Sequence, residues 1–549
     1  MLAKILSAVN EGLDSRLVEV EVDVPKGFPA FEIVGLADKA VSEAKERVRS
    51  AIINSGFKFL PGNKKRLIVN LAPADIKKEG SVYDLPIALG ILFASEQMAL
   101  VDQTRLVIDQ SLFVGELSLN GELRHTKGIL PMVILAKQKK IKNVYVPKDN
   151  AEEASLVDGI NVYPLDSLED LLFHLNFGRV EGPDSGRGKI IPFQPTKNWK
   201  EGLSKIDYEY DFAYIKGQEF VKRALEIAAA GGHNVLMIGA PGSGKTLLAR
   251  AMPSILPLMN KEEILQVTKI YSVTGLLKPN EYLKTQRPFR SPHHTTSDVA
   301  MVGGGQIPHP GEVSLAHRGI LFLDELAHFK RTTLESLRQP LEDGEISVAR
   351  ARGFVSYPAK FILVASMNPC PCGYYGDPEK ECGCSAGEII RYRRKISGPF
   401  LDRVDLHLDV PRVKIDKLMG EEVAESSAKI RTRVIKARQA QDKRFSVRNR
   451  SKKASPVAEQ SSLRGRLKTM TNSEMTISQI KKFCQLDKAG ENLLKQAIEK
   501  FILSARAYHR LLKVSRTIAD LAGSDEIRTE HLAEAIQYRT KVDMGADFN

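Results

Sequence analysis

The run Val235-Leu-Met-Ile-Gly-Ala-Pro-Gly-Ser-Gly-Lys-Thr-Leu-Leu-Ala-Arg250 passes from four apolar residues through a glycine-rich turn into a helix-forming stretch. In that setting glycines let successive backbone N–H groups point at phosphate oxygens. A chance glycine turn is the alternative, and the flanking strand and helix argue against it. We expect Lys245 to reach the β and γ phosphates of ATP and the Thr246 hydroxyl to bind Mg²⁺. The predicted phosphate-binding residues are Gly239, Ala240, Pro241, Gly242, Ser243, Gly244, Lys245 and Thr246.

Two carboxylates follow a second apolar strand. Gly319-Ile-Leu-Phe-Leu-Asp-Glu325 ends in Asp324 and Glu325, at the carboxyl edge of the expected sheet, where ligands of such sheets bind. Asp324 is predicted to hold the Mg²⁺ shell, and Glu325 to orient and activate the attacking water. Acidic pairs also cap helices, but an all-apolar strand that ends in two charges opposite a phosphate loop favours the catalytic interpretation.

Two further side chains are candidates for the same chemistry. Asn368 follows the expected strand at 361–366 and is predicted to hydrogen-bond the γ-phosphate or the water. Arg403 precedes the next expected strand, and an arginine supplied across a subunit interface can stabilise charge on the transferring phosphoryl group. The alternative for Arg403 is an intramolecular salt bridge with Asp402 or Asp405.

The chain has 549 residues, which suggests about three structural units. Residues 1–176 alternate short strands and helices and predict an α/β domain, and 177–205 have the Gly, Pro and charge content of a linker. Residues 206–412 predict a parallel sheet covered by helices on both faces, with a cysteine-rich insert at 370–384. Residues 413–549 predict a helical lid.

Individual elements follow from hydrophobic periodicity. The expected strands include Leu17–Val24, Arg66–Leu71, Val235–Ile238 and Ile320–Leu323. The expected helices include Asp38–Ser55, Ser81–Ala94, Ile477–Leu486, Gly490–Lys513 and Thr529–Arg539.

The composition bounds the class of protein. Hydrophobic residues make up 43% and charged residues 27%, which is the balance of a soluble globular protein. The sequence has no apolar run long enough to span a membrane and no signal peptide, so we expect a cytoplasmic protein without a membrane partner. The net charge of +13 favours a polyanionic partner, although charge alone identifies none.

Four of the five cysteines form two pairs, Cys370-Pro-Cys372 and Cys382-Gly-Cys384. Four thiolates in one short loop satisfy tetrahedral Zn²⁺, which would hold together a segment too small for a hydrophobic core of its own. Unligated thiols are the alternative. Cys484 is expected to be a core residue.

Several long motifs carry a family resemblance. They are Lys216-Gly-Gln218, Arg287-Pro-Phe-Arg-Ser-Pro-His-His294, Val302-Gly-Gly-Gly-Gln-Ile-Pro308, Gly319–Glu325, Met367-Asn-Pro-Cys-Pro-Cys-Gly373 and Ile396-Ser-Gly-Pro-Phe-Leu-Asp-Arg-Val-Asp405. With these runs the chain resembles the magnesium-chelatase-like AAA+ ATPases, and specifically the ComM/YifB-type competence proteins, over nearly its whole length.

The resemblance implies a homo-hexameric ring that acts as a DNA helicase, driving branch migration during recombination and natural transformation, with other recombination proteins as possible partners. The alternative is a chelatase-like assembly ATPase that remodels a protein partner. The first block resembles the proteolytic domain of Lon. Because the motifs that would carry its serine and lysine are displaced, with Ser81 and Lys127 the nearest candidates, we expect it to be inactive as a protease.

The resemblance also implies roles for residues that periodicity leaves unassigned. Arg506 is similar to the second sensor of the clade, with Arg510 a neighbouring candidate. Arg350 and Arg352 in the expected hairpin at 345–358 are implied to contact DNA in the ring pore, whereas a solvated strand face is the alternative. Between Lys429 and Lys468 there are fourteen Lys or Arg residues, which either neutralise phosphates or belong to a solvated helix and loop.

Overall fold

The computed structural model describes residues 2–36, 38–59, 66–78, 80–98, 102–177, 191–192, 194–195, 199, 208–278, 281–305, 308–350, 353–413, 424–446, 470–501 and 504–539. The chain forms two compact units. Unit 1 consists of Met1–Lys205 with Asn260–Thr285, and unit 2 of Ile206–Met259 with Gln286–Asn549. The predicted linker at 177–205 lies mostly outside the described residues.

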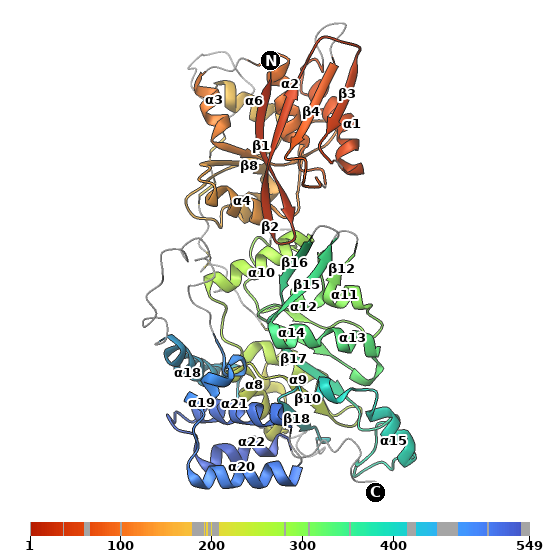
Figure 1. Ribbon diagram of the computed structural model, residues 1–549, viewed down its shortest axis with the longest axis vertical. Helices are drawn as coiled ribbons and strands as arrows, with labels where there is room; N and C mark the ends of the chain where they lie inside the picture. The colour runs from red at the N-terminus through yellow and green to blue at the C-terminus, as the bar shows by residue number, and fades with distance from the viewer. Residues whose placement is uncertain are drawn as a thin grey trace. The chain divides into compact units, whose positions relative to one another are not determined.

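Unit 1 contains a sheet in the order β1-β2-β4-β3. Its strands are β1 (Ala3–Glu11), β2 (Asp14–Asp23), β4 (Arg66–Ala72) and β3 (Ala30–Val34) (Figure 1). Along β2, Val18, Val20 and Val22 are fully buried while Glu19 is exposed, so the period of two directs one face of the strand to the core. Helix α2 (Asp84–Ala94), buried along its whole length, lies against β1 and β2. A Cβ on Gly90 would meet a Val22 methyl at 2.5 Å.

A second sheet of unit 1 is parallel, in the order β5-β8-β9. Its strands are β5 (Ser111–Phe113), β8 (Asn143–Pro147) and β9 (Asn161–Leu165), next to the hairpin of β6 (Glu116–Leu117) and β7 (Leu123–Arg124). The described α-helices of the unit are α1 (Lys39–Asn54), α2, α3 (Asp102–Asp109), α4 (Ile129–Gln138), α5 (Ala151–Ala154), α6 (Leu168–Phe177) and α10 (Lys261–Thr274).

Helix α10 comes from the middle of the chain but packs within unit 1. It lies against α4, the amide of Gly128 donates to the Ser272 carbonyl (3.0 Å), and Lys261 pairs with Asp158 (2.6 Å). The range expected for the nucleotide-binding core, 206–412, therefore includes a helix whose contacts belong to the other unit.

Unit 2 is built on a parallel sheet in the order β11-β14-β17-β10-β18. The strands are β11 (Phe289–Arg290), β14 (Ile320–Leu323), β17 (Ile362–Met367), β10 (Val235–Ile238) and β18 (Leu406–Asp409). Alternate residues of a strand enter different cores. In β10, Val235 and Met237 join one cluster and Leu236 joins the other. The prediction of a parallel sheet covered on both faces is confirmed.

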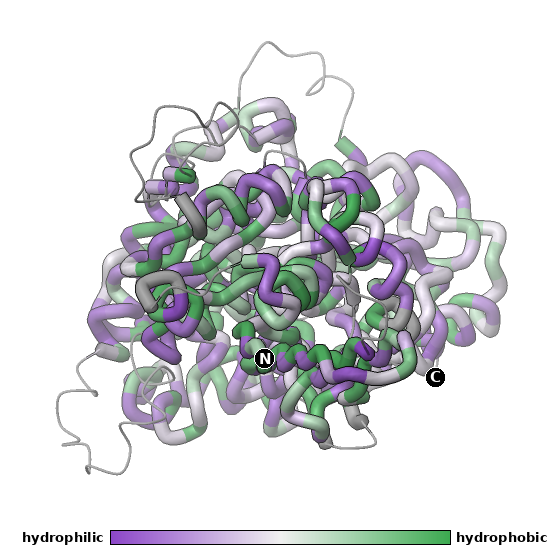
Figure 2. The backbone as a smooth tube through the Cα atoms, turned by 90° about the horizontal axis from the view of Figure 1, so that it is seen from above, coloured by the Kyte–Doolittle hydropathy of each residue, from purple (hydrophilic) through white to green (hydrophobic). Residues whose placement is uncertain are grey.

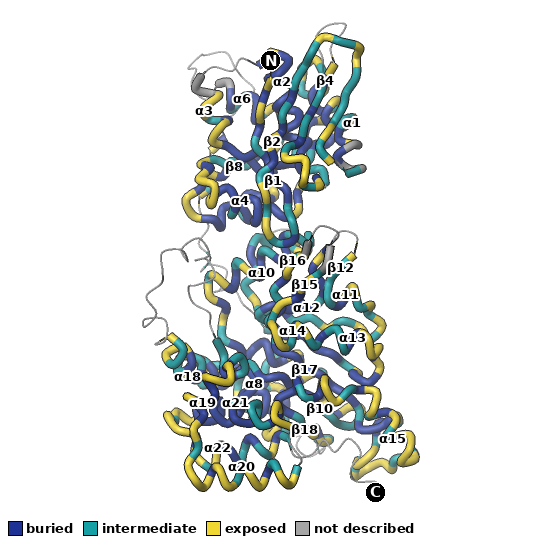
Figure 3. The backbone as a smooth tube through the Cα atoms, viewed as in Figure 1, coloured by how far each residue is buried: buried dark blue, intermediate teal, exposed yellow. Residues whose placement is uncertain are grey.

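Helices surround this sheet (Figure 1), and strand β17 is buried throughout (Figure 3). Helix α8 lies against β18 and α9 against β17. The described α-helices of this part are α8 (Glu219–Gly231), α9 (Lys245–Ala251), α11 (Asp298–Val302), α12 (Glu312–Leu315), α13 (Arg331–Ser336), α14 (Arg338–Asp343), α15 (Ala386–Arg393) and α16 (Gly398–Leu401). Two small hairpins are added, β12 (Gly303–Gly304) with β13 (His309–Pro310), and β15 (Glu345–Arg350) with β16 (Gly353–Pro358).

The carboxyl-terminal part of unit 2 is helical, as predicted for the lid. Its helices are α18 (Ser427–Ser446), α19 (Ile477–Phe483), α20 (Lys488–Phe501), α21 (Ala505–Leu521) and α22 (Thr529–Gln537). Hydrophobic and hydrophilic residues alternate over short distances along the chain (Figure 2). In α21 the buried apolar residues include Leu511, Leu512, Val514 and Ile518, so this helix presents an apolar face to the core. The expected single helix Gly490–Lys513 is wrong, because α20 ends at Phe501 and the Ser504 hydroxyl caps a new helix by accepting from the Ala507 amide (3.2 Å).

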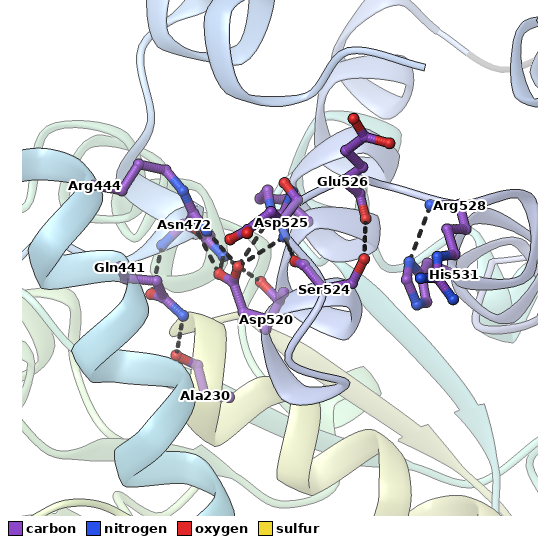
Figure 4. Close-up of polar contacts among 12 residues, drawn as sticks. Ala230, Gln441, Arg444, Asn472, Asp520, Ser524, Asp525, Glu526, Arg528 and His531 are labelled. Atoms are coloured by element: carbon purple, nitrogen blue, oxygen red, sulfur yellow. Dashed lines mark hydrogen bonds and ion pairs between the residues drawn. The ribbon is translucent and has the colours of Figure 1, made fainter. Parts of the chain in front are cut away.

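A buried carboxylate holds the lid helices together (Figure 4). Asp520 of α21 accepts hydrogen bonds from Arg444 of α18 (3.0 Å), from Arg516 (3.1 Å) and from Asn472 (2.8 Å). Gln441 of α18 donates to the carbonyl of Ala230 in α8 (3.1 Å). The lid is therefore tied to the helix that precedes the nucleotide loop.

Candidate nucleotide site

The glycine-rich turn lies between β10 and α9, as the sequence predicts. Gly244 has φ +88°, a conformation that favours glycine. A Cβ on Gly239 would come within 2.3 Å of the Val410 carbonyl oxygen, so the turn passes directly against the strand beside it. The Gln218 side chain donates to the carbonyls of Ser243 (2.5 Å) and Pro411 (3.0 Å), which fixes the turn from the side of α8.

Lys245 is 8% exposed, and its ammonium donates to the carbonyls of Gly239 (2.7 Å) and Ala240 (2.9 Å). Burial lowers the pKa of Lys245 from its ordinary value, and the charge of Asp324 opposes that shift. The same ammonium lies 3.5 Å from Oδ1 of Asn368. The predicted sensor residue and the predicted phosphate-binding lysine are therefore brought together.

Thr246 and Asp324, the two residues predicted to hold magnesium, are in direct contact. The Thr246 hydroxyl donates to Oδ2 of Asp324 (3.0 Å), while the Ser366 hydroxyl and the Glu325 amide donate to Oδ1. Adjacent oxygen ligands of octahedral Mg²⁺ at about 2.1 Å lie about 3.0 Å apart. The spacing of these two oxygens therefore fits the ion, and Ser366 is a supporting residue to which the sequence analysis gave no role.

Glu325 directly follows this carboxylate and has φ +53°. A left-handed backbone at a non-glycine residue costs about 1–3 kcal/mol, and such strain is concentrated at functional sites. Its carboxylate is half exposed and lies 3.7 Å from Nδ1 of His294 and 3.6 Å from Nδ1 of His328. The position suits a base that meets water, and the two imidazoles beside it were not given roles from the sequence, although His294 ends one of the quoted motifs.

Arg403 lies at the opposite edge of the sheet. It precedes β18, which runs parallel to β10, whereas the phosphate loop follows the carboxyl end of β10. The guanidinium is 3% exposed and pairs with Glu342, which is neither of the two aspartates named in the alternative interpretation. Arg506 lies 3.6 Å from the same carboxylate. The structure thus brings Arg403 and Arg506 together, apart from Lys245 of the same chain.

Asp405 supports the backbone of this arginine. Arg510 donates to Oδ1 of Asp405 (2.6 Å) and to the Arg403 carbonyl (3.0 Å), and the Asn234 amide donates to Oδ2 of Asp405 (2.9 Å). Burial by itself raises the pKa of Asp405, but Arg510, His233 and the Asn234 amide hold it well below its usual range.

The predicted DNA contacts are only partly described. Arg350 ends β15 opposite Gly353 of β16, and Arg352 lies outside the described residues. Of the basic stretch 429–468, residues 447–468 are also outside them. In α18, Arg431 donates to the Ser254 carbonyl (2.7 Å) and Arg438 to the Ala229 carbonyl (2.7 Å), so these arginines pack within unit 2.

The four cysteines of the insert converge. Their sulfur atoms all lie within 4.8 Å of one another, with Cys370 at 3.3 Å from Cys372 and 3.6 Å from Cys382. Cys484 is buried in the core that α8, β10 and the lid share, as the sequence indicated.

In unit 1 the two residues nearest to a protease pair have other contacts. The Ser81 hydroxyl donates to Glu116, and the aliphatic stem of Lys127 lies against Gly275, which ends α10.

Three family models match the chain. They are "Subunit ChlI of Mg-chelatase" over residues 20–150, "Magnesium chelatase, subunit ChlI" over 211–418 and "Magnesium chelatase, subunit ChlI C-terminal" over 424–539. The competence protein ComM of Haemophilus influenzae is 43% identical to it over 546 residues, with 98% of each chain covered. The chain belongs to the ComM/YifB-type magnesium-chelatase-like family. The family assignment made from the motifs is confirmed.

Other relatives are similar to this ComM/YifB-type chain over nearly its whole length or over part of it. YifB of Escherichia coli is 41% identical over 96% of this chain and 95% of that protein. The magnesium-chelatase 38 kDa subunit of Cereibacter sphaeroides is 28% identical over 182 residues, which cover 29% of this chain and 53% of the subunit. Membership in this AAA+ family supports an ATPase that uses ATP and Mg²⁺. None of the described helices has the length and apolar character needed to cross a bilayer.

Proposed function

We propose that this ComM/YifB-type protein is a ring-forming ATPase whose ATP site is completed by a neighbouring copy of the chain, and that the ring, a homo-hexamer, moves along DNA. One observation carries the proposal. Lys245, Thr246, Asp324 and Asn368 meet at the carboxyl edge of the sheet, while Arg403 and Arg506 meet at Glu342 near the other edge. We take these two groups as the halves of one phosphoryl-transfer site, which lie at opposite edges of the sheet in a single chain and meet between neighbouring copies.

Within one site the residues divide the work as follows. Lys245 leaves the carbonyls of the loop for the phosphates, and the Thr246 and Asp324 oxygens hold Mg²⁺, which neutralises charge on the phosphates when bound. Glu325 accepts a proton from the attacking water. Asn368 orients the γ-phosphate or that water. Arg403 from the next subunit stabilises the charge that develops on the transferred group.

A ring explains the pairing of Arg403 with Glu342. A guanidinium that is needed in a neighbouring site must be held in place before the neighbour binds ATP. The Glu342 side chain is 42% exposed, so the carboxylate of the pair reaches the surface where a second copy can approach. The Arg403 guanidinium is itself buried and also donates to the Pro399 carbonyl (2.5 Å), so it is held in place until it exchanges these partners for the neighbouring site.

DNA is the proposed track. The net charge of +13 favours a polyanion, and the relative that is 43% identical is named a competence protein. We propose branch migration during recombination in natural transformation as the process served. The contacts would come from the hairpin of β15 and β16 and from the basic stretch 429–468.

The test is ATP hydrolysis measured with no DNA, with single-stranded DNA and with a four-way branched DNA, each at low and high salt. We expect branched DNA to raise turnover, and the logarithm of the apparent affinity to fall linearly with the logarithm of salt concentration. A branch-migration assay with labelled strands then reports movement, with Lys245→Ala as the control. Turnover that DNA leaves unchanged at both salt concentrations would contradict the DNA track and favour the chelatase-like alternative, an assembly ATPase that remodels a protein partner.

A further inference from the structure

The cysteine loop lies where a structural metal is needed. From Pro371 to Ser385 the chain has neither helix nor strand, and Gly373 is the one residue of that fully described stretch that is buried. A segment without apolar burial has no hydrophobic term to offset the entropy of ordering it. Some other interaction must hold it in one conformation.

The sulfur positions have the dimensions of a metal site. Cys370, Cys372 and Cys382 are 3.3–3.6 Å apart in pairs, which is far longer than the bond of about 2.0 Å in a disulfide. With Zn–S bonds of about 2.3 Å, the edges of a regular tetrahedron are about 3.8 Å long. The observed separations therefore match four sulfurs around one ion, with Cys384 as the fourth corner.

Backbone amides point at the sulfur of Cys370, the buried member of the cluster. Gly373 and Tyr375 donate to it (3.2 and 3.3 Å). A neutral thiol is a weak acceptor, whereas a thiolate bound to a metal is stabilised by such outer hydrogen bonds.

The loop also touches the nucleotide site. Cys370 is two residues after Asn368, and Gly373 packs on the phosphate loop, since a Cβ there would lie 2.7 Å from Cδ of Pro241. Arg393 donates to the Pro369 carbonyl (3.2 Å) and stacks over the ring of Tyr375 at 5.2 Å. The loop is therefore fixed between the turn that binds phosphate and the helix α15 that follows it.

We propose that Cys370, Cys372, Cys382 and Cys384 bind one Zn²⁺ as thiolates, and that this ion positions Asn368 and the Pro241 turn for ATP hydrolysis. The cysteines are positioning residues in this account, because their proposed effect on ATP hydrolysis acts through Asn368 and Pro241. The metal site stands on the sulfur geometry alone, whereas its effect on turnover rests on the proposed ATPase function.

Metal content tests the first half without reference to activity. Protein purified without chelator is expected to carry about one zinc per chain, and Cys382→Ser with Cys384→Ser is expected to lose it. Cys484→Ala, which removes the buried fifth cysteine, is the matched control and keeps the metal. Should the double variant fail to fold, Co²⁺ exchanged into the wild-type protein must show the visible bands of tetrahedral thiolate coordination. Zinc well below one equivalent, iron in its place, or cobalt without those bands overturns the assignment.

Turnover tests the second half. Release of zinc from the wild-type protein by a mercurial reagent is expected to lower kcat about tenfold or more while the Kd for ATP changes less than about threefold. Gly373→Ala and Gly376→Ala form a matched pair, because both glycines have positive φ but only Gly373 contacts Pro241. We expect both variants to keep zinc and only Gly373→Ala to lose turnover. Equal kcat in the pair, or zinc-free protein with full kcat, overturns the positioning role, whereas a wild-type protein that binds zinc but never hydrolyses ATP refutes the proposed function instead.

Discussion

Replacement of Asp405 by Asn should lower the stability of unit 2 and also disturb the position of Arg403. Oδ1 of Asp405 accepts from Arg510 and Oδ2 accepts from the Asn234 amide. An asparagine turned either way places its NH₂ group against one of these donors, so one contact becomes a clash of two N–H groups.

The size of the effect follows from burial. The side chain of Asp405 is 2% exposed and that of Arg510 is 20% exposed. Breaking a buried ion pair costs about 3–5 kcal/mol, and we expect about 3 kcal/mol because Arg510 retains some water and its bond to the Arg403 carbonyl. Since Arg510 is then no longer anchored by a carboxylate, the Arg403 segment that it contacts is held less precisely and turnover should fall about tenfold, while ATP affinity is unchanged because the phosphate loop lies at the other edge of the sheet.

The pH dependence of stability gives a second test of the pair of Asp405 and Arg510. The pKa of Asp405 is held below its usual range, so its contribution to stability is fully present above the unfolded value of about 3.9 and is lost as the pH falls below it. The difference between wild type and Asp405→Asn should therefore shrink in acid.

Urea denaturation at several pH values measures this, with the transition of unit 2 identified by its shift on adding a non-hydrolysable ATP analogue. Asp402→Asn, at a half-buried carboxylate three residues earlier, is the control and should unfold like wild type. Equal stabilities of the two variants at neutral pH would refute the reasoning.

Three further outcomes are expected. Glu325→Gln should retain ATP but lower kcat about 10²–10⁴-fold, and a variant with wild-type turnover would remove Glu325 from the role of base. Thr246→Ala should raise the Mg²⁺ concentration for half-maximal turnover about tenfold, while Thr246→Ser, which keeps the hydroxyl, should not; similar curves for the two would contradict the magnesium pair. Asp520→Ala leaves Arg444 and Arg516 without their carboxylate and should destabilise unit 2 by about 3–5 kcal/mol in denaturant; a loss below about 1 kcal/mol would show that the network does not hold the lid.

Local patterns were sufficient where one physical cause dominates. Helix α1 was expected at Asp38–Ser55, and the structure has Lys39–Asn54 with Asp38 as its cap, accepting from the Val41 amide. The glycine-rich turn lies between a strand and a helix as predicted, because an apolar run, a cluster of glycines and a helix-forming stretch follow one another directly.

Hydrophobic periodicity failed where the apolar residues of two consecutive helices continue with the same helical spacing. The stretch Gly490–Lys513 has a continuous helical pattern, but Ser504 offers its hydroxyl to the backbone and starts a new helix there. A side-chain cap of this kind competes with helix continuation over a few residues, which a window of eleven or more residues averages away.

The remaining parts of the site depend on contacts distant in sequence. Glu342 and Arg403 are 61 residues apart in the sequence. His294 and Glu325 are likewise brought together by the tertiary structure, and no sequence motif contains both. The packing of α10 in unit 1 also could not be predicted, because an apolar helix face shows that a helix is packed but not which unit it packs against. Pairing of these groups requires the tertiary structure.

Subunit mixing tests the shared site most directly. Lys245→Ala disables the phosphate loop of its own chain, and Arg403→Ala disables only the site of the neighbour that it serves. Each variant alone should be inactive, and an equal mixture should recover about one quarter of wild-type turnover, since one interface in four then pairs an intact loop with an intact arginine. A mixture as inactive as its components, or an active Arg403→Ala protein, would contradict an ATP site shared between neighbouring copies.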